Sequence, residues 1–314
     1  MRITASVGDC RVAFTQTLLE LAREDASIYA LASDSRGSVT LGNFTKELPG
    51  QFVEIGIAEQ NEIGVAAGLA AMGKKPFVCA PASFLSARSL EQIKVDVAYS
   101  RQNVKIVGVS GGISYGALGY THHSTHDLAV MRAIAGIEVY LPCDAAQTRA
   151  MTRSLASRAG GAYVRMGRGM VPDIYQKEAP FEPGKSNLLR NGGDLTIIAA
   201  GEMVYHAMEA AKRLGEDNIS ACVLDMHTIK PLDEAAILKA AARTGRLVTM
   251  EEHSRYGGLG GAAAEVICGA QPVPLLILAL PDEDIIPGKS AEVFAYYGLD
   301  GAGASQRIAA WMNQ

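Results

Sequence analysis

The chain reads, from residue 52 to residue 70, Phe52-Val53-Glu54-Ile55-Gly56-Ile57-Ala58-Glu59-Gln60-Asn61-Glu62-Ile63-Gly64-Val65-Ala66-Ala67-Gly68-Leu69-Ala70. This pattern predicts a short strand, a tight turn at Gly56 and a helix that ends near Gly73. In a parallel sheet the carboxyl end of a strand faces the ligand crevice, so we expect Glu59 at that edge, in the first helical turn. A purely structural role is also open for Glu59 and Glu62, because acidic side chains stabilise a helix N-terminus.

The alternation of strand and helix continues along the chain. Amphipathic segments at residues 203–214 and 233–242 predict helices. Apolar runs rich in β-branched residues, without strict alternation, predict strands that are buried on both faces, as in a parallel sheet. These runs lie at residues 104–109, 195–200, 221–224, 247–250 and 275–278. We therefore expect an α/β protein that is doubly wound around mostly parallel sheets.

The length of 314 residues suggests two domains. The segment from residue 171 to residue 193 is polar, contains three prolines and has no clear hydrophobic period, which is typical of a linker. We expect a first domain of residues 1–175 and a second domain of residues 190–314.

The composition excludes several classes of protein. With 48% hydrophobic and 20% charged residues, the chain can build a sizeable core and is not expected to be disordered. The net charge of −4 gives no bulk electrostatic reason to bind nucleic acid or a membrane surface. Five scattered cysteines without a CxxC pair argue against a disulfide framework. Since no apolar run approaches the ~18–20 residues of a membrane span and no signal peptide is recognisable, we expect a cytoplasmic protein.

Two further segments carry side chains suited to chemistry. The segment from Phe77 to Arg88 predicts a strand, a loop and a helix, with Phe84 in the loop as a stacking surface or a core aromatic. Three of the six histidines lie between His122 and His126, after a Gly-rich loop that can bring imidazoles against a substrate. The same two histidines have the spacing of helical metal ligands, but no third ligand is obvious, so the sequence predicts no metal site.

Arginines and a glycine-rich turn add weaker signals. Arg11 lies near the start of the first helix, and Arg165 and Arg168 follow a strand. Guanidinium groups at these positions are suited to binding phosphate oxygens, but ordinary surface arginines without a ligand fit the pattern equally well. The run Glu251-Glu252-His253 ends a strand and precedes a glycine-rich turn through Gly261. This turn is only loosely similar to a dinucleotide fingerprint, because its glycines equally permit close helix packing.

The order of these segments resembles the thiamine-diphosphate-dependent transketolase family, and in particular the C-terminal half that forms a separate chain in split bacterial transketolases. The segments that carry the resemblance are Gly56-Ile57-Ala58-Glu59-Gln60, Ala82-Ser83-Phe84-Leu85, Gly119-Tyr120-Thr121-His122 and Glu251-Glu252-His253 through Gly261. The resemblance implies a pyrimidine-binding domain in residues 1–175 and a transketolase C-terminal domain in residues 190–314. It implies transfer of a two-carbon ketol unit from a ketose, with a phosphate group, to an aldose.

Other functions remain open, because two related enzyme types share these domains. The chain is also similar to the β subunit of 2-oxo-acid dehydrogenase E1 and to deoxyxylulose-phosphate synthase. A non-catalytic scaffold subunit that kept the fold is a further alternative. Two arginines suited to binding a phosphate group, Arg11 and Arg168, favour a sugar phosphate as substrate.

The resemblance also implies a partner polypeptide. The family binds the diphosphate and a divalent ion, such as Mg²⁺, through a Gly-Asp-Gly motif, which this sequence lacks. We therefore expect an N-terminal transketolase subunit to supply that half of the site. Family precedent implies a dimeric core of this chain flanked by two partner chains, a heterotetramer, with no nucleic acid and no membrane involved.

The resemblance assigns cofactor-binding roles to four residues. Glu59 matches the glutamate that bonds N1′ of the aminopyrimidine, where a shared proton favours the imino tautomer that activates the cofactor. Phe84 matches the aromatic residue that stacks on the pyrimidine. Ile57 lies where the family packs an apolar side chain against the cofactor, and Asp34 matches an acid near it.

It also assigns substrate-binding roles. Arg11, Ser38 and Arg168 fall where the family binds a sugar phosphate, and His122 matches a histidine that faces substrate oxygens and takes part in catalysis. Ser110 lies at a substrate-binding position where many relatives have another histidine.

Two further departures concern specificity. Leu118 stands four positions before His122. Sugar transketolases often have an acidic residue at this position, which recognises a hydroxyl group of the donor sugar. Gln60-Asn61 stands at a position where the family has a pair of residues that contains histidine. We therefore expect an unusual donor, such as a branched or modified sugar.

Overall fold

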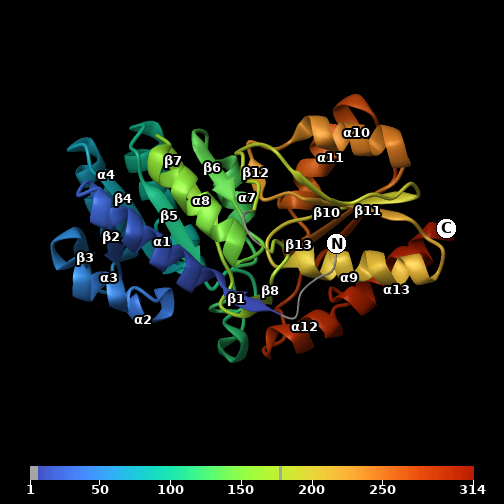
Figure 1. Ribbon diagram of the computed structural model, residues 1–314, viewed down its shortest axis with the longest axis horizontal. Coiled ribbons are helices and arrows are strands. Elements are labelled where there is room, and N and C mark those ends of the chain that lie inside the picture. Colours follow the sequence, from blue (N-terminus) through green and yellow to red (C-terminus); the bar gives the residue numbers. More distant parts are fainter. Residues whose placement is uncertain (1–5, 177–178) are drawn as a thin grey trace.

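The computed structural model describes residues 6–176 and 179–314. Two α/β lobes lie side by side, with the N-terminal half of the chain in one lobe and most of the C-terminal half in the other (Figure 1). Within the described residues, a seven-stranded sheet has the order β12-β6-β7-β5-β4-β2-β3 and is parallel except for β12. Its strands are β2 (Ile28–Ala32), β3 (Phe52–Glu54), β4 (Lys75–Pro81), β5 (Lys105–Val109), β6 (Ile137–Tyr140), β7 (Gly161–Arg165) and β12 (Thr228–Lys230).

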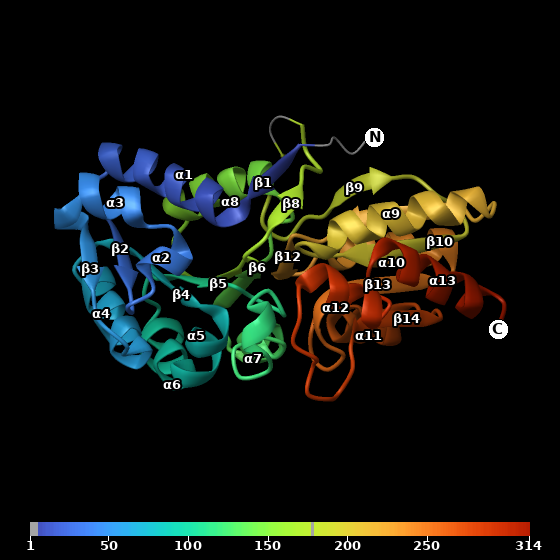
Figure 2. The same cartoon turned by 90° about the horizontal axis from the view of Figure 1, so that it is seen from below.

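Helices cover both faces of this sheet (Figure 2). On one face α1 (Cys10–Glu24) packs against α8 (Ala145–Ser157). On the other face α4 (Glu59–Ala71) contacts α5 (Ala82–Arg88) and the π-helical segment η2 (Ile93–Tyr99), and α5 contacts α7 (Asp127–Ala133). Shorter elements are α2 (Arg36–Val39), α3 (Gly42–Glu47), α6 (Leu90–Gln92), η1 (Pro49–Gln51) and η3 (Gly116–Leu118).

The second lobe repeats the same architecture around a smaller sheet. In the described part of the chain this five-stranded sheet has the order β14-β13-β10-β11-β9, with only β9 antiparallel. The strands are β9 (Asn187–Arg190), β10 (Leu195–Ala199), β11 (Ala221–Asp225), β13 (Leu247–Ser254) and β14 (Leu275–Leu280). Its helices are α9 (Met203–Glu216), α10 (Glu234–Thr244), α11 (Leu259–Ala270), α12 (Ser290–Tyr296) and α13 (Gly301–Met312). The predicted doubly wound, mostly parallel α/β fold is confirmed.

The two lobes are joined by more than the connecting segment. Strand β12 belongs to the C-terminal half of the chain, yet it pairs with β6 at the edge of the first sheet. One hydrophobic cluster runs from Leu31 in β2 to Ile267 in α11. Strands β1 (Val7–Asp9) and β8 (Met170–Pro172) form a separate antiparallel pair. Strand β12 from the predicted second domain thus completes the sheet of the first. The division of the chain into domains of residues 1–175 and 190–314 stays a prediction.

Asp144 fixes the connecting segment to the first lobe. Its buried carboxylate caps α8 by accepting a hydrogen bond from Gln147 N at 2.8 Å. The same side chain accepts from Ile174 N at 2.9 Å and from Tyr175 N at 2.7 Å. One carboxylate therefore satisfies three backbone donors that are shielded from water.

Replacing Asp144 by alanine is expected to lower the free energy of unfolding by about 2–4 kcal/mol, because a helix cap and two further donors lose their acceptor. The matched control is Asp300→Ala, which removes the α13 cap to Gly303 N and no second contact of this kind. For the control we expect a loss of about 1 kcal/mol. Urea denaturation followed by circular dichroism measures both, and equal losses would contradict the role given to Asp144.

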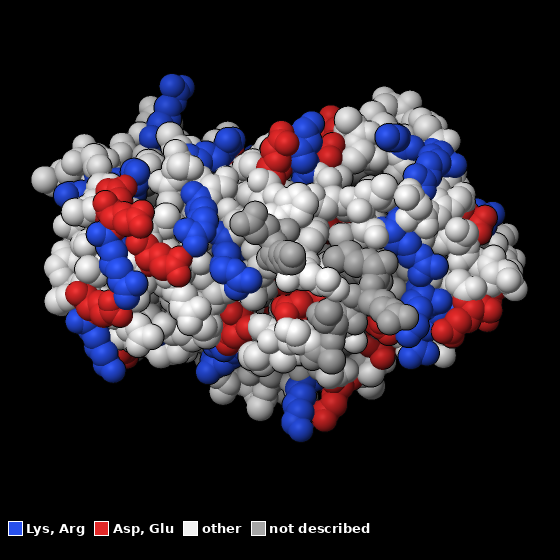
Figure 3. Space-filling model, in the orientation of Figure 1, with Lys and Arg blue, Asp and Glu red and all other residues white. Residues whose placement is uncertain are grey.

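On the face in Figure 3, acidic and basic side chains are interspersed. None of the helices in the described residues is long and apolar enough to cross a membrane.

Candidate active site

The predicted strand–turn–helix around Glu59 is confirmed. Strand β3 ends at Glu54, Gly56 adopts the left-handed conformation with φ +78°, and α4 begins at Glu59. The Glu59 side chain lies inside, with the residue only 2% exposed. Its Oε2 accepts a hydrogen bond at 2.6 Å from Nη1 of Arg88, the last residue of α5. A buried carboxylate with one cationic partner therefore stands at the carboxyl edge of the sheet.

The Arg88 guanidinium leads from Glu59 to an aromatic surface. Its central carbon lies 4.8 Å from the centre of the Phe84 ring, a cation–π distance. The prediction that Phe84 lies in a loop is wrong, because β4 ends at Pro81 and α5 starts at the next residue. Phe84 is consequently one helical turn before Arg88, and its ring is only partly buried. It is therefore available to a ligand in a way that a core aromatic is not.

Beyond Phe84 the contacts continue to the predicted phosphate-binding arginine. The His122 ring stands edge-on to Phe84 at 5.4 Å and to Tyr115 at 5.3 Å between ring centres. The exposed Arg168 guanidinium lies 5.3 Å from the centre of the Tyr115 ring. We call this series of contacts the Phe84 row; its members are Glu59, Arg88, Phe84, His122, Tyr115 and Arg168.

A cavity of about 450 Å³ opens beside the Phe84 row, between α5 and the histidine-rich loop. Phe84 and Arg88 line one side, and the loop supplies hydroxyl and imidazole groups on the other. The lining residues are Ser83, Phe84, Ala87, Arg88, Tyr120, Thr121, His123, Thr125 and His126. Burial lowers the pKa of His123 and of His126, so both imidazoles are neutral at pH 7. An aromatic face, neutral imidazoles and a nearby buried carboxylate suit a flat heteroaromatic ring.

A second group of predicted residues lies at the ends of β1 and β2. Arg11 forms an ion pair with Asp9 at 2.7 Å and donates to the backbone oxygen of Ser38 at 3.0 Å. Asp34 is exposed, has φ +52°, and its N–H donates to Glu54 Oε1 at 2.7 Å. The structure thus brings Arg11 and Ser38 together. Asp34 lines a neighbouring cavity of about 540 Å³ with Arg36, Gly37, Thr40, Gly42 and Thr45.

Three predicted positions stand apart from these contacts. Ser110 is fully buried after β5, has φ +57°, and its hydroxyl finds no hydrogen-bond partner among the described residues. The side chains of Ile57 and Leu118 are 76% and 55% exposed. In the single chain, neither apolar side chain is covered.

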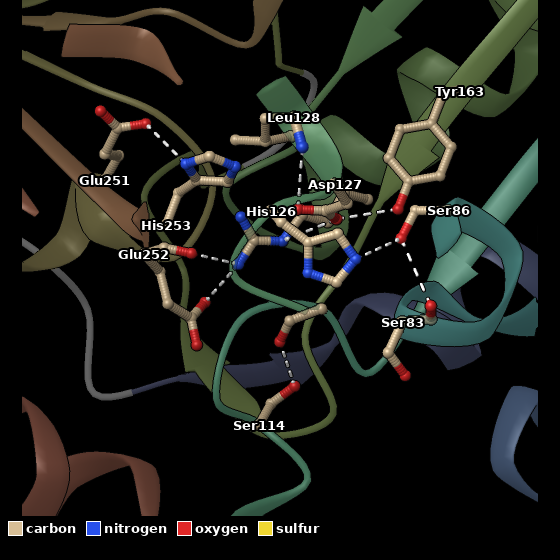
Figure 4. A network of polar contacts seen from close by, with 12 residues as sticks. Ser83, Ser86, Ser114, His126, Asp127, Leu128, Tyr163, Glu251, Glu252 and His253 are labelled. Carbon is tan, nitrogen blue, oxygen red and sulfur yellow. Dashed lines mark hydrogen bonds and ion pairs between the residues drawn. The ribbon is translucent and has the colours of Figure 1, made fainter. Parts of the chain in front are cut away.

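Arg165 belongs to a buried network and not to a phosphate site. Figure 4 shows Asp127, Tyr163 and Glu252, the acidic and hydroxyl side chains of this network. Its Nη2 donates to the backbone oxygen of Glu252 at 2.6 Å and to Glu252 Oε2 at 3.1 Å. Its Nε lies 3.6 Å from Oδ2 of Asp127, which also accepts from the Tyr163 hydroxyl at 2.8 Å. The other Glu252 oxygen accepts from Ile113 N at 2.8 Å. The network therefore holds the loop after β5 against strand β13 of the second lobe.

The other two members of the Glu251-Glu252-His253 run are also structural. Glu251 accepts hydrogen bonds from Leu259 N at 2.6 Å and Gly260 N at 2.7 Å, at the start of α11. His253 Nε2 accepts from Ala129 N at 3.3 Å. Because a carboxylate already occupies the N-terminus of α11, a phosphate has no place there, and the dinucleotide interpretation is excluded.

Sequence reasoning missed Arg88, Tyr115 and the Arg165–Glu252 pair. The spacing of Phe84 and Arg88 was the available signal, since residues four apart share a face once both are helical. The remaining contacts join segments that are far apart in sequence. In the parts of the chain that the structure describes, no three His, Cys, Asp or Glu side chains form a group that could hold a metal ion.

Two family descriptions match the chain. Residues 8–173 match "Transketolase, pyrimidine binding domain", and residues 184–303 match "Transketolase, C-terminal domain".

Named relatives and a solved structure agree with these matches. A subunit of the apulose-4-phosphate transketolase of Phocaeicola vulgatus is 58% identical over 94% of this chain and 94% of its own length. The 6-deoxy-6-sulfo-D-fructose transketolase subunit SqwH of a Clostridium species is 43% identical over 87% of this chain and 84% of its own length. The solved structure described as "Split gene transketolase, inactive beta4 tetramer" superimposes with a TM-score of 0.90 at 37% identity, over 98% of this chain and 99% of that one.

Proposed function

Because the chain belongs to the transketolase family, we propose that it is the subunit of a two-chain transketolase that carries the pyrimidine-binding half of the active site. The reaction is transfer of a two-carbon ketol unit from a ketose donor to an aldose acceptor. The observation that carries the proposal is the buried Glu59 carboxylate, bonded to Arg88, at one end of the Phe84 row.

The residues present suit thiamine diphosphate, which when bound supplies the electron sink that ketol transfer requires. Glu59 would hold a proton at N1′ of the aminopyrimidine, and its burial excludes water from that bond. Phe84 would stack on the pyrimidine, with its partly buried ring lining the 450 Å³ cavity. Ile57, exposed in the single chain, would be covered by the cofactor, and Asp34 would lie near it.

The diphosphate and a divalent ion, Mg²⁺ in our proposal, would be held by a partner chain. This sequence has no Gly-Asp-Gly motif. The relative named as one subunit of a transketolase, and the split-gene relative whose beta4 tetramer is described as inactive, support a site completed by another chain. We propose two copies of each chain, with this chain as the dimeric core, working in the cytoplasm.

The substrate class is an anionic sugar. Arg11, with Ser38 beside it, and the exposed Arg168 would bind a phosphate group. His122 and Ser110 would face sugar oxygens. Leu118 stands where sugar transketolases often have an acidic residue that recognises a donor hydroxyl, which supports a branched or modified donor. The two named relatives, whose names specify apulose 4-phosphate and 6-deoxy-6-sulfo-fructose, support the same class.

The test is reconstitution with the chain that a neighbouring gene encodes and that bears a Gly-Asp-Gly motif. Both chains together, with thiamine diphosphate and Mg²⁺, are expected to transfer a ketol unit from an anionic ketose to an aldose, and either chain alone to be inactive. Parallel assays with 2-oxo acids, and with pyruvate plus glyceraldehyde 3-phosphate, address the E1 and deoxyxylulose-phosphate synthase alternatives. Activity in those assays without ketol transfer would contradict the proposal.

A further inference from the structure

The carboxylate of Asp9 already occupies the guanidinium group of Arg11. Asp9 Oδ2 lies 2.7 Å from Nη2 of Arg11, and Asp9 Oδ1 accepts a hydrogen bond from Nε at 3.2 Å. The third guanidinium nitrogen, Nη1, donates to the backbone oxygen of Ser38 at 3.0 Å. Every nitrogen of the arginine that we propose to bind a phosphate group therefore has an acceptor within the chain itself.

Asp9 also takes the place of an anion at the start of α1. Its side chain is the N-cap of this helix, and Oδ1 accepts a hydrogen bond from Arg11 N at 2.8 Å. Backbone N–H groups at a helix N-terminus and guanidinium groups both bind phosphate oxygens. One internal carboxylate satisfies both kinds of donor here, so it competes with any external anion that approaches them.

The ion pair of Asp9 and Arg11 is poorly screened by water. The side chains of Arg11 and Asp9 are only 12% and 14% exposed. Charges that are partly buried act on their neighbours more strongly than charges at the surface, because less water and salt lie between them. The negative charge of Asp9 therefore opposes an anion at Arg11, whether that anion displaces the carboxylate or binds beside it.

A second acid near this ion pair is Glu202, the residue before α9. A Cβ atom added to Gly167 would lie 1.7 Å from Glu202 Oε1, so this carboxyl group touches the backbone next to Arg168. Burial raises the pKa of Glu202 to about 8, and the negative charge of Glu252 adds to this effect. At pH 7 Glu202 is therefore mostly neutral, and the charge that opposes an anion comes from Asp9.

We propose that Asp9 is a specificity-determining residue for the anionic group of the substrate, because its charge beside Arg11 disfavours a doubly charged group more than a singly charged one. The energy between two charges scales with their product, so a phosphate monoester dianion is repelled about twice as strongly as a sulfonate. The ion pair thereby brings the affinities for these two groups closer together. The inference rests on the function proposed above, in which Arg11 binds the anionic end of the sugar.

The first test is thermal unfolding of the full chain at pH 7 and constant ionic strength, with methyl phosphate or methanesulfonate as the probe. Methyl phosphate is largely a dianion at this pH, whereas methanesulfonate is a monoanion. Asp9→Asn keeps a side-chain oxygen to cap α1 and removes the charge. From the dependence of Tm on probe concentration, we expect the variant to bind methyl phosphate about tenfold and methanesulfonate about threefold more tightly than wild type. Equal gains for the two probes, or no gain, would overturn the proposal.

Glu20→Gln is the matched control for the removal of one negative charge. Glu20 lies on the same helix and pairs at 2.8 Å with Arg153, but both side chains are 52% exposed. Neither probe should bind more tightly to this variant, and a gain as large as that of Asp9→Asn would overturn the proposal. If Asp9→Asn does not fold, Asp9→Ser also caps a helix without a charge and must show the same preference for methyl phosphate. Its absence there would count equally against the proposal.

The second test uses the two-chain enzyme with the anionic ketose that it accepts. In Asp9→Asn the inhibition constant of methyl phosphate is expected to fall about tenfold, with kcat within about twofold of wild type, because the charge acts on binding of the anion. Arg11→Met is expected to raise the same constant.

The outcomes separate this inference from the proposed function. An effect of Arg11→Met without any effect of Asp9→Asn would overturn this inference alone. If Arg11→Met has no effect, Arg11 does not bind the anionic end, and the inference fails together with that part of the proposed function. An inactive wild-type complex whose chain still shows the expected probe preference would support the inference and count against ketol transfer.

Discussion

Glu59→Gln is expected to lower the kcat of the assembled two-chain enzyme about a thousandfold, the scale of a lost general acid–base group. Glutamine fits the same buried position and can still contact Arg88. It cannot exchange a proton with the cofactor ring, so the loss should fall on kcat and leave binding of the cofactor largely intact. Steady-state ketol-transfer rates and cofactor titration measure the two separately.

The control for Glu59 is an exposed glutamate of the same lobe. Glu91 lies on α6 at the surface, and Glu91→Gln should leave kcat unchanged. A fully active Glu59→Gln enzyme would contradict the catalytic role and favour the scaffold alternative, in which the fold persists without its chemistry.

Arg165→Met is expected to lower the free energy of unfolding by about 3–5 kcal/mol, because the substitution leaves buried acidic groups without their cationic partner. The arginine and Glu252 side chains are only 4% and 7% exposed and lie 3.1 Å apart, and Asp127 on the other side is fully buried. Since the Glu252 side chain also holds Ile113 N, the loop that carries Tyr115 and His122 should loosen as well.

The exposed pair Arg153–Glu20 gives a matched control, with both side chains 52% exposed and 2.8 Å apart. Arg153→Met should cost only about 0–1 kcal/mol, because solvent screens an exposed ion pair. Urea denaturation of the full-length variants at pH 7 measures the difference. Losses of similar size for the two arginines would show that the buried network contributes no more than a surface pair.

The sequence was most informative where the structure depends on local pattern. The period of hydrophobic residues and the glycine at position 56 predicted the β3–turn–α4 unit and the edge position of Glu59, and both are observed. Buried strands such as β5 and β10 could be predicted equally well, because strands that are covered on both faces are continuously apolar.

Long-range contacts could not be predicted in this way. Nothing in the local sequence states that Arg88 faces Glu59, since that depends on how α5 packs beside α4. Arg165 resembled Arg168 in its position after a strand, yet one is buried against Glu252 and the other is exposed over Tyr115. Phe84 was misplaced because a loop was expected between the strand and the helix, whereas α5 starts directly after β4 ends at Pro81.

Strand β12 carries a consequence for how such chains can be rearranged. Its backbone hydrogen bonds cover β6, although β12 lies in the half of the chain that builds the other sheet. A fragment that stopped before Thr228 would leave the outer side of β6 free to recruit foreign strands, which is how aggregation begins at an uncovered edge. In a chimera that takes its C-terminal half from a relative, the incoming β12 must still pair with β6 of the recipient. The two halves of the chain are therefore best exchanged together.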